Sequence, residues 1–229
     1  QMMRKIIGKI IDIVLPPKEG EAASKEAAPA TEVKAVSLEQ LLGGALGEGA
    51  GEPDLRVIGL YSSVEDEKIA ELTQALLYLN ETNRLLPEGK EKKPVEFYIN
   101  TYGGSADDMF AMYDVMQQVM EETEIHTIGV GKVMSAGTLL LAAGTKGKRK
   151  IGKNCRVMIH NVAAGNFGNL PNLANELEAI QRLQEDYISA MVDNTKFTRK
   201  KLEKLLNEKV NIYLDADEAV KYGLADEIM

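Results

Sequence analysis

The pattern of apolar and polar positions divides residues 55–229 into strand-like and helix-like segments. Short apolar runs rich in β-branched residues, typical of buried strands, occupy 56–61, 94–100, 125–131 and 156–162. Between them, apolar residues recur every three or four positions, as on one face of a helix. These positions are Ile69, Leu72, Leu76 and Leu79, and then Met109, Met112, Tyr113, Met116 and Met120. With an apolar helix at 136–143, the alternation predicts an α/β fold, a mainly parallel sheet flanked by helices.

A long amphipathic helix is predicted after the last strand, from Leu173 to Met191. Its apolar positions are Leu173, Leu177, Ile180, Leu183 and Ile188. Such a stripe packs either on the helix's own domain or on another chain, and the pattern fits both. For the first helix, Ser63 followed by Asp66 resembles a capping pattern and predicts a start after Ser63.

The first 54 residues follow a different pattern. Ile6, Ile7, Ile10, Ile11 and Val14 form one helical face, and residues 18–36 are rich in Glu, Ala, Lys, Thr and Pro without periodicity, as in a flexible linker. A short helix is predicted at 37–46, before a glycine-rich stretch. We expect two parts: an amphipathic segment and linker at 1–54, and one compact domain at 55–229. Segment 1–54 fits a propeptide, a docking arm for a partner or a flexible entrance element.

Composition and charge narrow the function classes. The 229 residues carry a formal net charge of −8, which argues against nucleic acid or an anionic membrane as the main partner, because both select clustered Lys and Arg. No apolar run approaches the length of a membrane span. The single cysteine, Cys155, cannot form an internal disulfide, and no Cys or His cluster has metal-ligand spacing. We therefore expect a cytoplasmic protein without a metal or other cofactor.

Ser135 stands between a predicted strand and a predicted helix. The small residues Ala136 and Gly137 follow it, so the serine hydroxyl can project from the turn while the Ala136 amide points toward the same place from the helix start. The sequence resembles the G-x-S-x-G turn of hydrolases, but Val133 stands where the first glycine would be. This arrangement suits a nucleophile. A serine that merely caps the helix would have the same sequence.

A serine nucleophile needs a base, and the chain has only two histidines. His126 begins a strand among polar residues, where a solvated side chain is expected. His160 ends the apolar strand Val157–Ile159, and open α/β sheets assemble their sites at strand ends. His160 is therefore the candidate base, although a structural histidine also fits this place.

A third turn of interest is Asn100-Thr101-Tyr102-Gly103-Gly104. Two successive glycines let the backbone approach a ligand closely, and one of their amides could donate to an oxyanion. A plain tight turn would use the same residues. Neither a phosphate-binding loop nor a dinucleotide fingerprint matches the spacing.

The order and spacing of these segments resemble the proteolytic subunit of the Clp protease. The matching segments are Tyr98 to Gly104, Met134 to Gly137, Leu140 to Gly144, Arg156 to His160 and Asp217 to Asp226. The resemblance covers about residues 55–229 and implies the Clp-protease/crotonase fold. It also implies that Ser135 is the nucleophile, His160 the general base, and the Gly104 and Ala136 amides the oxyanion hole. The strand around Ala163, Ala164 and Gly165 would bind the substrate backbone, and the helix from Leu173 would be the handle between rings.

The same resemblance implies partners. A Clp-protease subunit forms stacked heptameric rings of identical subunits that degrade unfolded polypeptides delivered by an AAA+ unfoldase ATPase. This chain has no Walker-type nucleotide motif, so unfolding energy would come from another protein.

The sequence also departs from that family. Ala136 replaces a usual methionine, Tyr102 replaces a proline of the glycine loop, and Lys132-Val133-Met134 replaces a more neutral run. More seriously, the catalytic aspartate of the family falls at Asn211. An asparagine can orient an imidazole but cannot neutralise imidazolium, and an Asp-to-Asn change in a serine protease lowers kcat about 10⁴-fold. We expect a slow enzyme or one that recruits another carboxylate, with Asp215 the nearest in sequence.

Two other functions fit parts of the sequence. A weakly active or non-catalytic Clp-like ring subunit would explain Asn211 but not the retained Ser135 and His160. A crotonase-type enzyme would use paired amides to stabilise a thioester enolate and would need no serine and histidine at these places.

Overall fold

The structure is a computed structural model, and it describes residues 55–163, 169–208 and 210–229. All described residues belong to one compact unit, the second unit of the chain, which spans residues 54–229. The helix predicted at 37–46 and the rest of the segment 1–54 lie outside the described residues.

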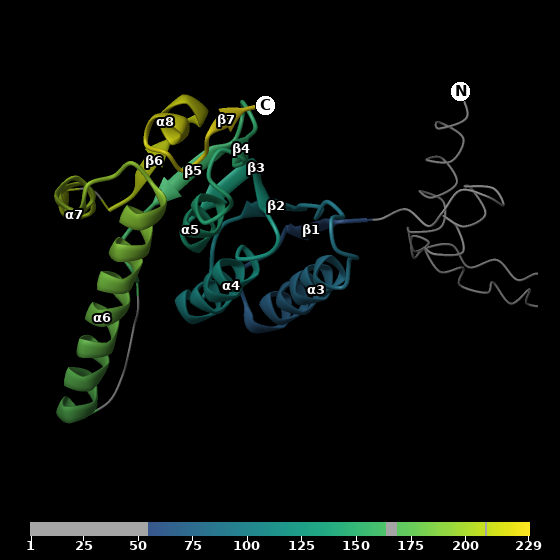
Figure 1. Cartoon of the computed structure of the whole chain (residues 1–229). Helices are drawn as coiled ribbons and strands as arrows, with labels where there is room; N and C mark the ends of the chain where they lie inside the picture. Colours follow the sequence, from purple (N-terminus) through teal and green to yellow (C-terminus); the bar gives the residue numbers. More distant parts are fainter. Residues whose placement is uncertain (1–54, 164–168, 209) are drawn as a thin grey trace, which may run out of the picture. The chain divides into compact units, whose positions relative to one another are not determined.

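Strands and helices alternate along most of the second unit (Figure 1). In chain order they are β1 (Val57–Leu60), α3 (Asp66–Arg84), β2 (Val95–Thr101), α4 (Ala106–Val119), β3 (Ile125–Met134), α5 (Ala136–Ala142), β4 (Lys150–Ile151), β5 (Arg156–Ile159), α6 (Leu170–Asn194), α7 (Arg199–Glu208), β6 (Ile212–Leu214), α8 (Ala216–Lys221) and β7 (Glu227–Ile228).

The sheet forks at β3. Strands β1, β2, β3, β4 and β7 are neighbours in that order and run parallel. The first part of β3 pairs with β4 through Ile128, whereas its last residues, Lys132 to Met134, pair with β5. Strand β6 then adds to β5 in the antiparallel sense. This confirms the predicted α/β class with a mainly parallel sheet.

A β-bulge lets β3 serve both branches. Along the β2–β3 pair, Ile99 pairs with Gly129, but Thr101 pairs with Val133, so the register shifts between them. Gly131 lies in the shifted stretch with φ of 67°. A bulge bends a strand and re-aims the residues beyond it, so the end of β3 points along the β5 branch.

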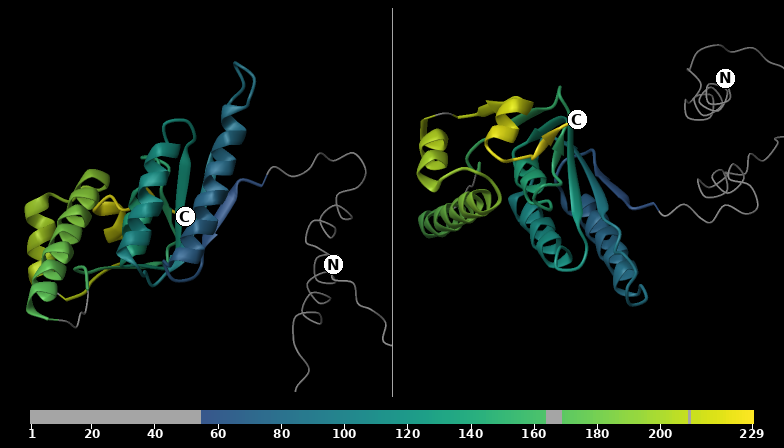
Figure 2. Two further views of the ribbon diagram at one scale, coloured as in Figure 1. Left: turned by 90° about the horizontal axis from the view of Figure 1, so that it is seen from below. Right: turned by 45° about the horizontal axis from the view of Figure 1, so that its top comes forward.

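Helices α3, α4 and α5 pack on one face of the sheet (Figures 1 and 2). The apolar positions predicted for the first helix are all buried, as are Met109, Met112 and Met116 of α4. Several predicted boundaries were wrong, including the end of β3, which lies at Met134 and not at 131. Helix α3 begins at Asp66 after Glu65, which makes no side-chain capping bond, so Ser63 does not cap it. Strand β5 ends at Ile159, so His160 follows the strand.

Helix α6 is long, as predicted, and its two halves differ. Its C-terminal half buries Tyr187, Ile188 and Met191, while Leu170, Leu173 and Leu177 in the other half are exposed. In Figure 1 that half extends away from the sheet. In the part of the chain that the structure describes, no helix is both long and apolar enough to cross a membrane.

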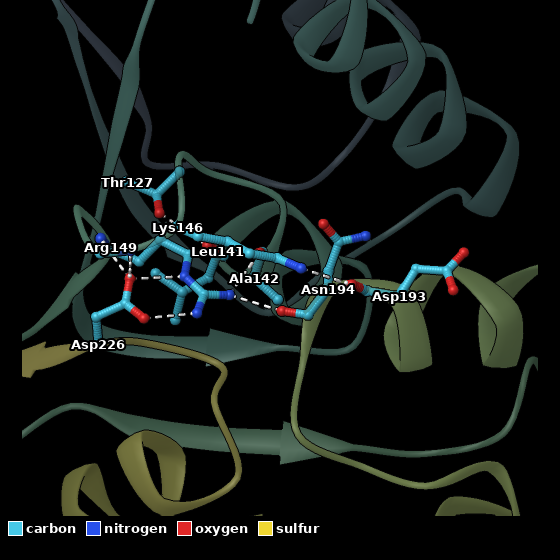
Figure 3. Close-up of polar contacts among 9 residues, drawn as sticks. Thr127, Leu141, Ala142, Lys146, Arg149, Asp193, Asn194 and Asp226 are labelled. Atoms are coloured by element: carbon cyan, nitrogen blue, oxygen red, sulfur yellow. Dashed lines mark hydrogen bonds and ion pairs between the residues drawn. The ribbon is translucent and has the colours of Figure 1, made fainter.

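One buried ion pair ties the end of the chain to the helices (Figure 3). Arg149, whose side chain is only 5% exposed, donates from Nε and Nη2 to the two carboxylate oxygens of Asp226, at 2.8 and 2.6 Å. Its Nη1 donates to the carbonyls of Ala142 and Asn194, at the ends of α5 and α6. The Asp226 carboxylate also accepts from the Gly147 amide. Arg149 therefore fixes the end of the helix that begins beside Ser135.

Replacing Asp226 with Asn tests this ion pair. The hydrogen bond to Arg149, foremost, lowers the pKa of Asp226 from 3.8 to about 2, so its contribution is complete above pH 4 and is lost as the pH falls toward 2. We expect Asp226→Asn to lower the free energy of unfolding by about 2 kcal/mol at pH 7 and by about half as much at pH 3, measured by urea denaturation.

The neighbouring variant Glu227→Gln is the control. Glu227 is exposed, and its oxygen lies 4.0 Å from Lys150 Nζ, so this change should leave stability almost unaltered at both pH values. Equal losses from the two variants would contradict a special role for the buried pair.

Candidate active site

Ser135 joins β3 to α5 in a strained backbone conformation. Its φ and ψ are 54° and −123°, and among the described residues it is the only non-glycine residue with positive φ. Such a conformation persists only where the surroundings enforce it. The Ser135 amide donates to the Met158 carbonyl on β5 at 2.8 Å, which anchors the turn to the neighbouring strand.

The carbonyl of Ser135 is held by Thr138, which is in turn hydrogen-bonded to Tyr187. The amide and the hydroxyl of Thr138 both donate to this carbonyl, at 3.0 and 2.7 Å. The Tyr187 hydroxyl of α6 lies 2.9 Å from Thr138 Oγ1 and is the donor of that bond, because the Thr138 hydrogen is already used. Burial raises the pKa of Tyr187 to about 12, so the phenol remains a donor. Nothing in the sequence pattern of α6 indicated that Tyr187 reaches this turn.

The glycine loop packs directly against the serine turn. A Cβ at Gly103, whose φ is 101°, would lie 2.5 Å from Ser135 Cβ, and one at Gly104 would lie 2.2 Å from the Val64 carbonyl oxygen. Val64 is bound to the loop by two backbone hydrogen bonds, with Gly103 and Ser105. Only glycine fits both positions, which explains the pair of glycines that stands out in the sequence.

His160 faces Ser135 as the sequence predicted. Its Nε2 lies 2.8 Å from Ser135 Oγ. Its Nδ1 lies 2.5 Å from the backbone oxygen of Asn161, and a carbonyl can only accept, so the proton of a neutral ring is on Nδ1. Nε2 is then free to accept the serine proton. The other histidine, His126, pairs with Glu124 at the opposite end of β3.

An open cavity of about 250 Å³ lies over this pair. Its lining includes Ser135, His160, Gly104, Ala136 and Ala163. The amides of Gly104 and Ala136 find no acceptor among the described residues, as expected for a helix start and an irregular turn. Two unpaired amides, a serine and a histidine therefore border one cavity. Of the three residues predicted to bind the substrate backbone, Ala163 lies in its wall, and Ala164 and Gly165 lie outside the described residues.

Asn211 lies next to His160 where the β5–β6 pair ends. The antiparallel β5–β6 ladder ends with Ile159 opposite Ile212, and its next pair would be His160 and Asn211. Both residues line a second open cavity of about 530 Å³. Within the described ranges, however, no residue shares a hydrogen bond with the Asn211 side chain, and His160 Nδ1 uses the Asn161 carbonyl instead.

Asp215, the other carboxylate considered from the sequence, is engaged elsewhere. It begins α8, where its side chain accepts from the Glu218 amide at 2.8 Å and its own amide donates to Glu218 in a capping box. It stands four residues beyond Asn211 and lines neither cavity beside His160. Its carboxylate is therefore used to start a helix and is not directed at the imidazole.

Two unusual residues near the turn contact each other. Lys132 Nζ lies 4.5 Å from the centre of the Tyr102 ring and donates to Asn100 Oδ1 at 2.8 Å. The contact joins the glycine loop to the end of β3 through a cation–π interaction. Tyr102 and Lys132 thus belong to one structural feature, which their separate positions in the sequence could not reveal.

The arrangement can perform acyl transfer through a covalent intermediate. Within the described ranges, no group of His, Cys, Asp and Glu side chains is placed to hold a metal ion. A serine within hydrogen-bond reach of a neutral imidazole is an activated nucleophile, and paired amides beside it can stabilise an oxyanion.

The chain is similar in sequence to known proteins. The family model described as Clp protease matches residues 53–229. A protein of Deinococcus radiodurans named ATP-dependent Clp protease proteolytic subunit is 33% identical over 174 residues, which cover 76% of this chain and 80% of that protein.

The backbone of Ser135 generates a stability prediction. At positive φ the usual advantage of alanine over glycine is reversed, because Cβ is disfavoured there. We expect Ser135→Gly to be more stable than Ser135→Ala by about 1 kcal/mol in urea denaturation.

Ser189, inside α6, provides the matched comparison. There the order should be normal, with Ser189→Ala more stable than Ser189→Gly by about 1 kcal/mol, because glycine is unfavourable within a helix. The same order at both positions would show that the turn at Ser135 is not strained.

Proposed function

Because residues 53–229 match its family model, the chain belongs to the Clp protease family, and from this premise we propose that it is a serine endopeptidase subunit. The proposal is supported above all by the 2.8 Å contact between Ser135 Oγ and His160 Nε2 beneath two unpaired amides. Ser135 attacks the scissile carbonyl, and His160 takes the serine proton and later delivers it to the leaving amine. The Gly104 and Ala136 amides stabilise the negative charge of the tetrahedral intermediate.

The segment after His160 binds the substrate in this proposal. Ala163 lines the cavity and begins the stretch Ala163, Ala164 and Gly165, whose backbone would pair with an extended peptide. Recognition through main-chain hydrogen bonds tolerates many sequences, as a protease of unfolded polypeptides requires. No metal or cofactor enters these steps.

Assembly and partners follow from the family. The named relative is a subunit of an ATP-dependent Clp protease. We propose that this chain likewise works in the cytoplasm with an AAA+ unfoldase ATPase and forms stacked heptameric rings of identical subunits. The exposed leucines in the first half of α6 support a contact with another copy, because an apolar stripe away from its own core needs a partner.

A weakly active subunit is the second candidate, and Asn211 is the observation that favours it. Asparagine adds no charge beside His160, and the Asn211 side chain has no hydrogen bond within the described part of the chain. The imidazolium formed during acylation would then lack the carboxylate that stabilises it in a complete triad.

The proposed nucleophile and base can be tested by covalent labelling. A fluorophosphonate should label the assembled protein at Ser135, and short fluorogenic peptides should be cleaved. Ser135→Ala and His160→Ala should reduce both reactions to background, by up to about 10⁶-fold in kcat as in comparable serine-protease variants. His126→Ala is the control and should retain both. An assembled protein without labelling that depends on Ser135 would refute the endopeptidase.

The role of Asn211 predicts the effect of restoring a carboxylate. Asn211→Asp should raise kcat toward fluorogenic peptides at pH 7 by at least about tenfold, with about 10⁴-fold as the ceiling set by the reverse change in a serine protease. Asn175→Asp adds the same charge on the exposed part of α6 and should have no effect. The Asn211→Asp variant could be labelled and active and yet show no rise in kcat. In that case Asn211 does not occupy the position of the acid.

A further inference from the structure

The cavity beside His160 on the side of Asn211 has an acidic residue in its wall. Its lining includes His160, Asn161, Asn207, Glu208 and Asn211. Glu208 is the only acidic residue among its described lining residues, and it comes from a different element than the family's acid, since it ends α7. We propose that Glu208 supplies the negative charge that Asn211 lacks and supports His160 as a positioning residue.

The backbone around His160 holds the end of α7 close to the imidazole. The Asn161 carbonyl accepts from His160 Nδ1, and the Asn161 side chain donates from Nδ2 to the Leu206 carbonyl at 3.0 Å. Glu208 follows Leu206 by two residues on the same last turn of α7. Both ring nitrogens of His160 already have partners, so Glu208 would act on the imidazolium through its charge across this cavity of about 530 Å³ and not through a hydrogen bond to the ring.

Glu208 gains little from its present surroundings. Its ion-pair partner within the described part of the chain is Lys204, at 3.7 Å, and both side chains are more than half exposed, so this pair adds little stability. A carboxylate at the C-terminal end of a helix also faces the negative end of the helix dipole. The Glu208 side chain therefore loses little stabilisation if it rotates and directs its carboxylate into the cavity.

Few other titratable groups surround His160. Apart from the Ser135 hydroxyl, the described residues that line either cavity beside His160 include Glu208 and Tyr187 as titratable groups. Tyr187 is buried and hydrogen-bonded to Thr138 and remains neutral at working pH. A change in the pH profile of activity on removal of the Glu208 carboxylate can thus be assigned to Glu208.

The inference rests on the proposed function and is tested by Glu208→Gln, assayed as the pH profile of kcat/KM for a fluorogenic peptide. A carboxylate near the imidazolium stabilises its positive charge. Removal of this carboxylate should shift the acidic limb of the profile to lower pH by about 0.5 to 1 pH unit. It should also lower kcat/KM at the plateau about three- to tenfold. Glu208→Lys should produce a larger loss than Glu208→Gln.

Glu203→Gln is the matched control. Glu203 also lies on α7 and pairs with a basic residue four positions away, Arg199, but it does not line either cavity beside His160. It should leave the pH profile unchanged. Identical profiles for Glu208→Gln and Glu203→Gln would overturn the inference, while fluorophosphonate labelling of Ser135 would show separately whether the proposed function stands.

A double variant shows whether Glu208 replaces the missing acid of the triad or only changes the net charge near His160. In the Asn211→Asp background the new carboxylate supplies the acid and Glu208 is no longer needed. Adding Glu208→Gln to that background should therefore cost no more than adding Glu203→Gln. An equal loss from Glu208→Gln in both backgrounds would show that Glu208 does not take the place of the acid. Circular dichroism and the sedimentation profile should be the same for all variants, because Glu208 and Asn211 are exposed and Glu203 is partly exposed.

Discussion

The site depends on one strained residue. Ser135 holds φ at 54°, which a side chain disfavours, and its backbone is clamped by hydrogen bonds on both sides of the turn: its amide to β5 and its carbonyl to Thr138. Without this clamp the turn would relax, and the hydroxyl would leave His160. The Tyr187 hydroxyl extends the clamp to α6, and Arg149 fixes the far end of α5. Hydrogen bonds of Thr138, Tyr187 and Arg149 therefore help to hold the backbone of Ser135 in place.

The fork in the sheet determines where Ser135 lies. If β3 remained paired with β4 to its end, Ser135 would lie away from β5 and from His160. The bulge at Gly131 shifts the register, and the last residues of β3 pair with Arg156 to Met158 instead. The contact between Lys132 and Tyr102 lies at this point and joins the glycine loop to the re-aimed strand. The geometry of the site is thus a consequence of how one strand divides its hydrogen bonds.

Electrostatics distinguish this site from a complete triad. The imidazole is oriented by a neutral carbonyl, which fixes the tautomer as well as a carboxylate would. Orientation and charge are separable, however, because only an anion stabilises the imidazolium that forms when the serine attacks. The second cavity leaves the side of His160 near Asn211 open to water. An amide residue, Asn211, and an acidic residue, Glu208, line this cavity from different parts of the chain.

The sequence by itself determined the fold class, the order of the longer elements from β1 to α6 and the candidate pair, Ser135 and His160. Apolar periodicity specifies which face of each helix is buried, and small residues are required wherever backbone segments touch, as at Gly103 and Gly104. These requirements are local, so they can be recognised along the chain. The tertiary structure decided the rest: the bulge in β3, the reach of Tyr187 to the serine turn, the engagement of Asp215 in a cap, and the presence of Glu208 beside His160. These features join residues that are distant in sequence, and their positions depend on how strands pair and helices end, which no local pattern encodes.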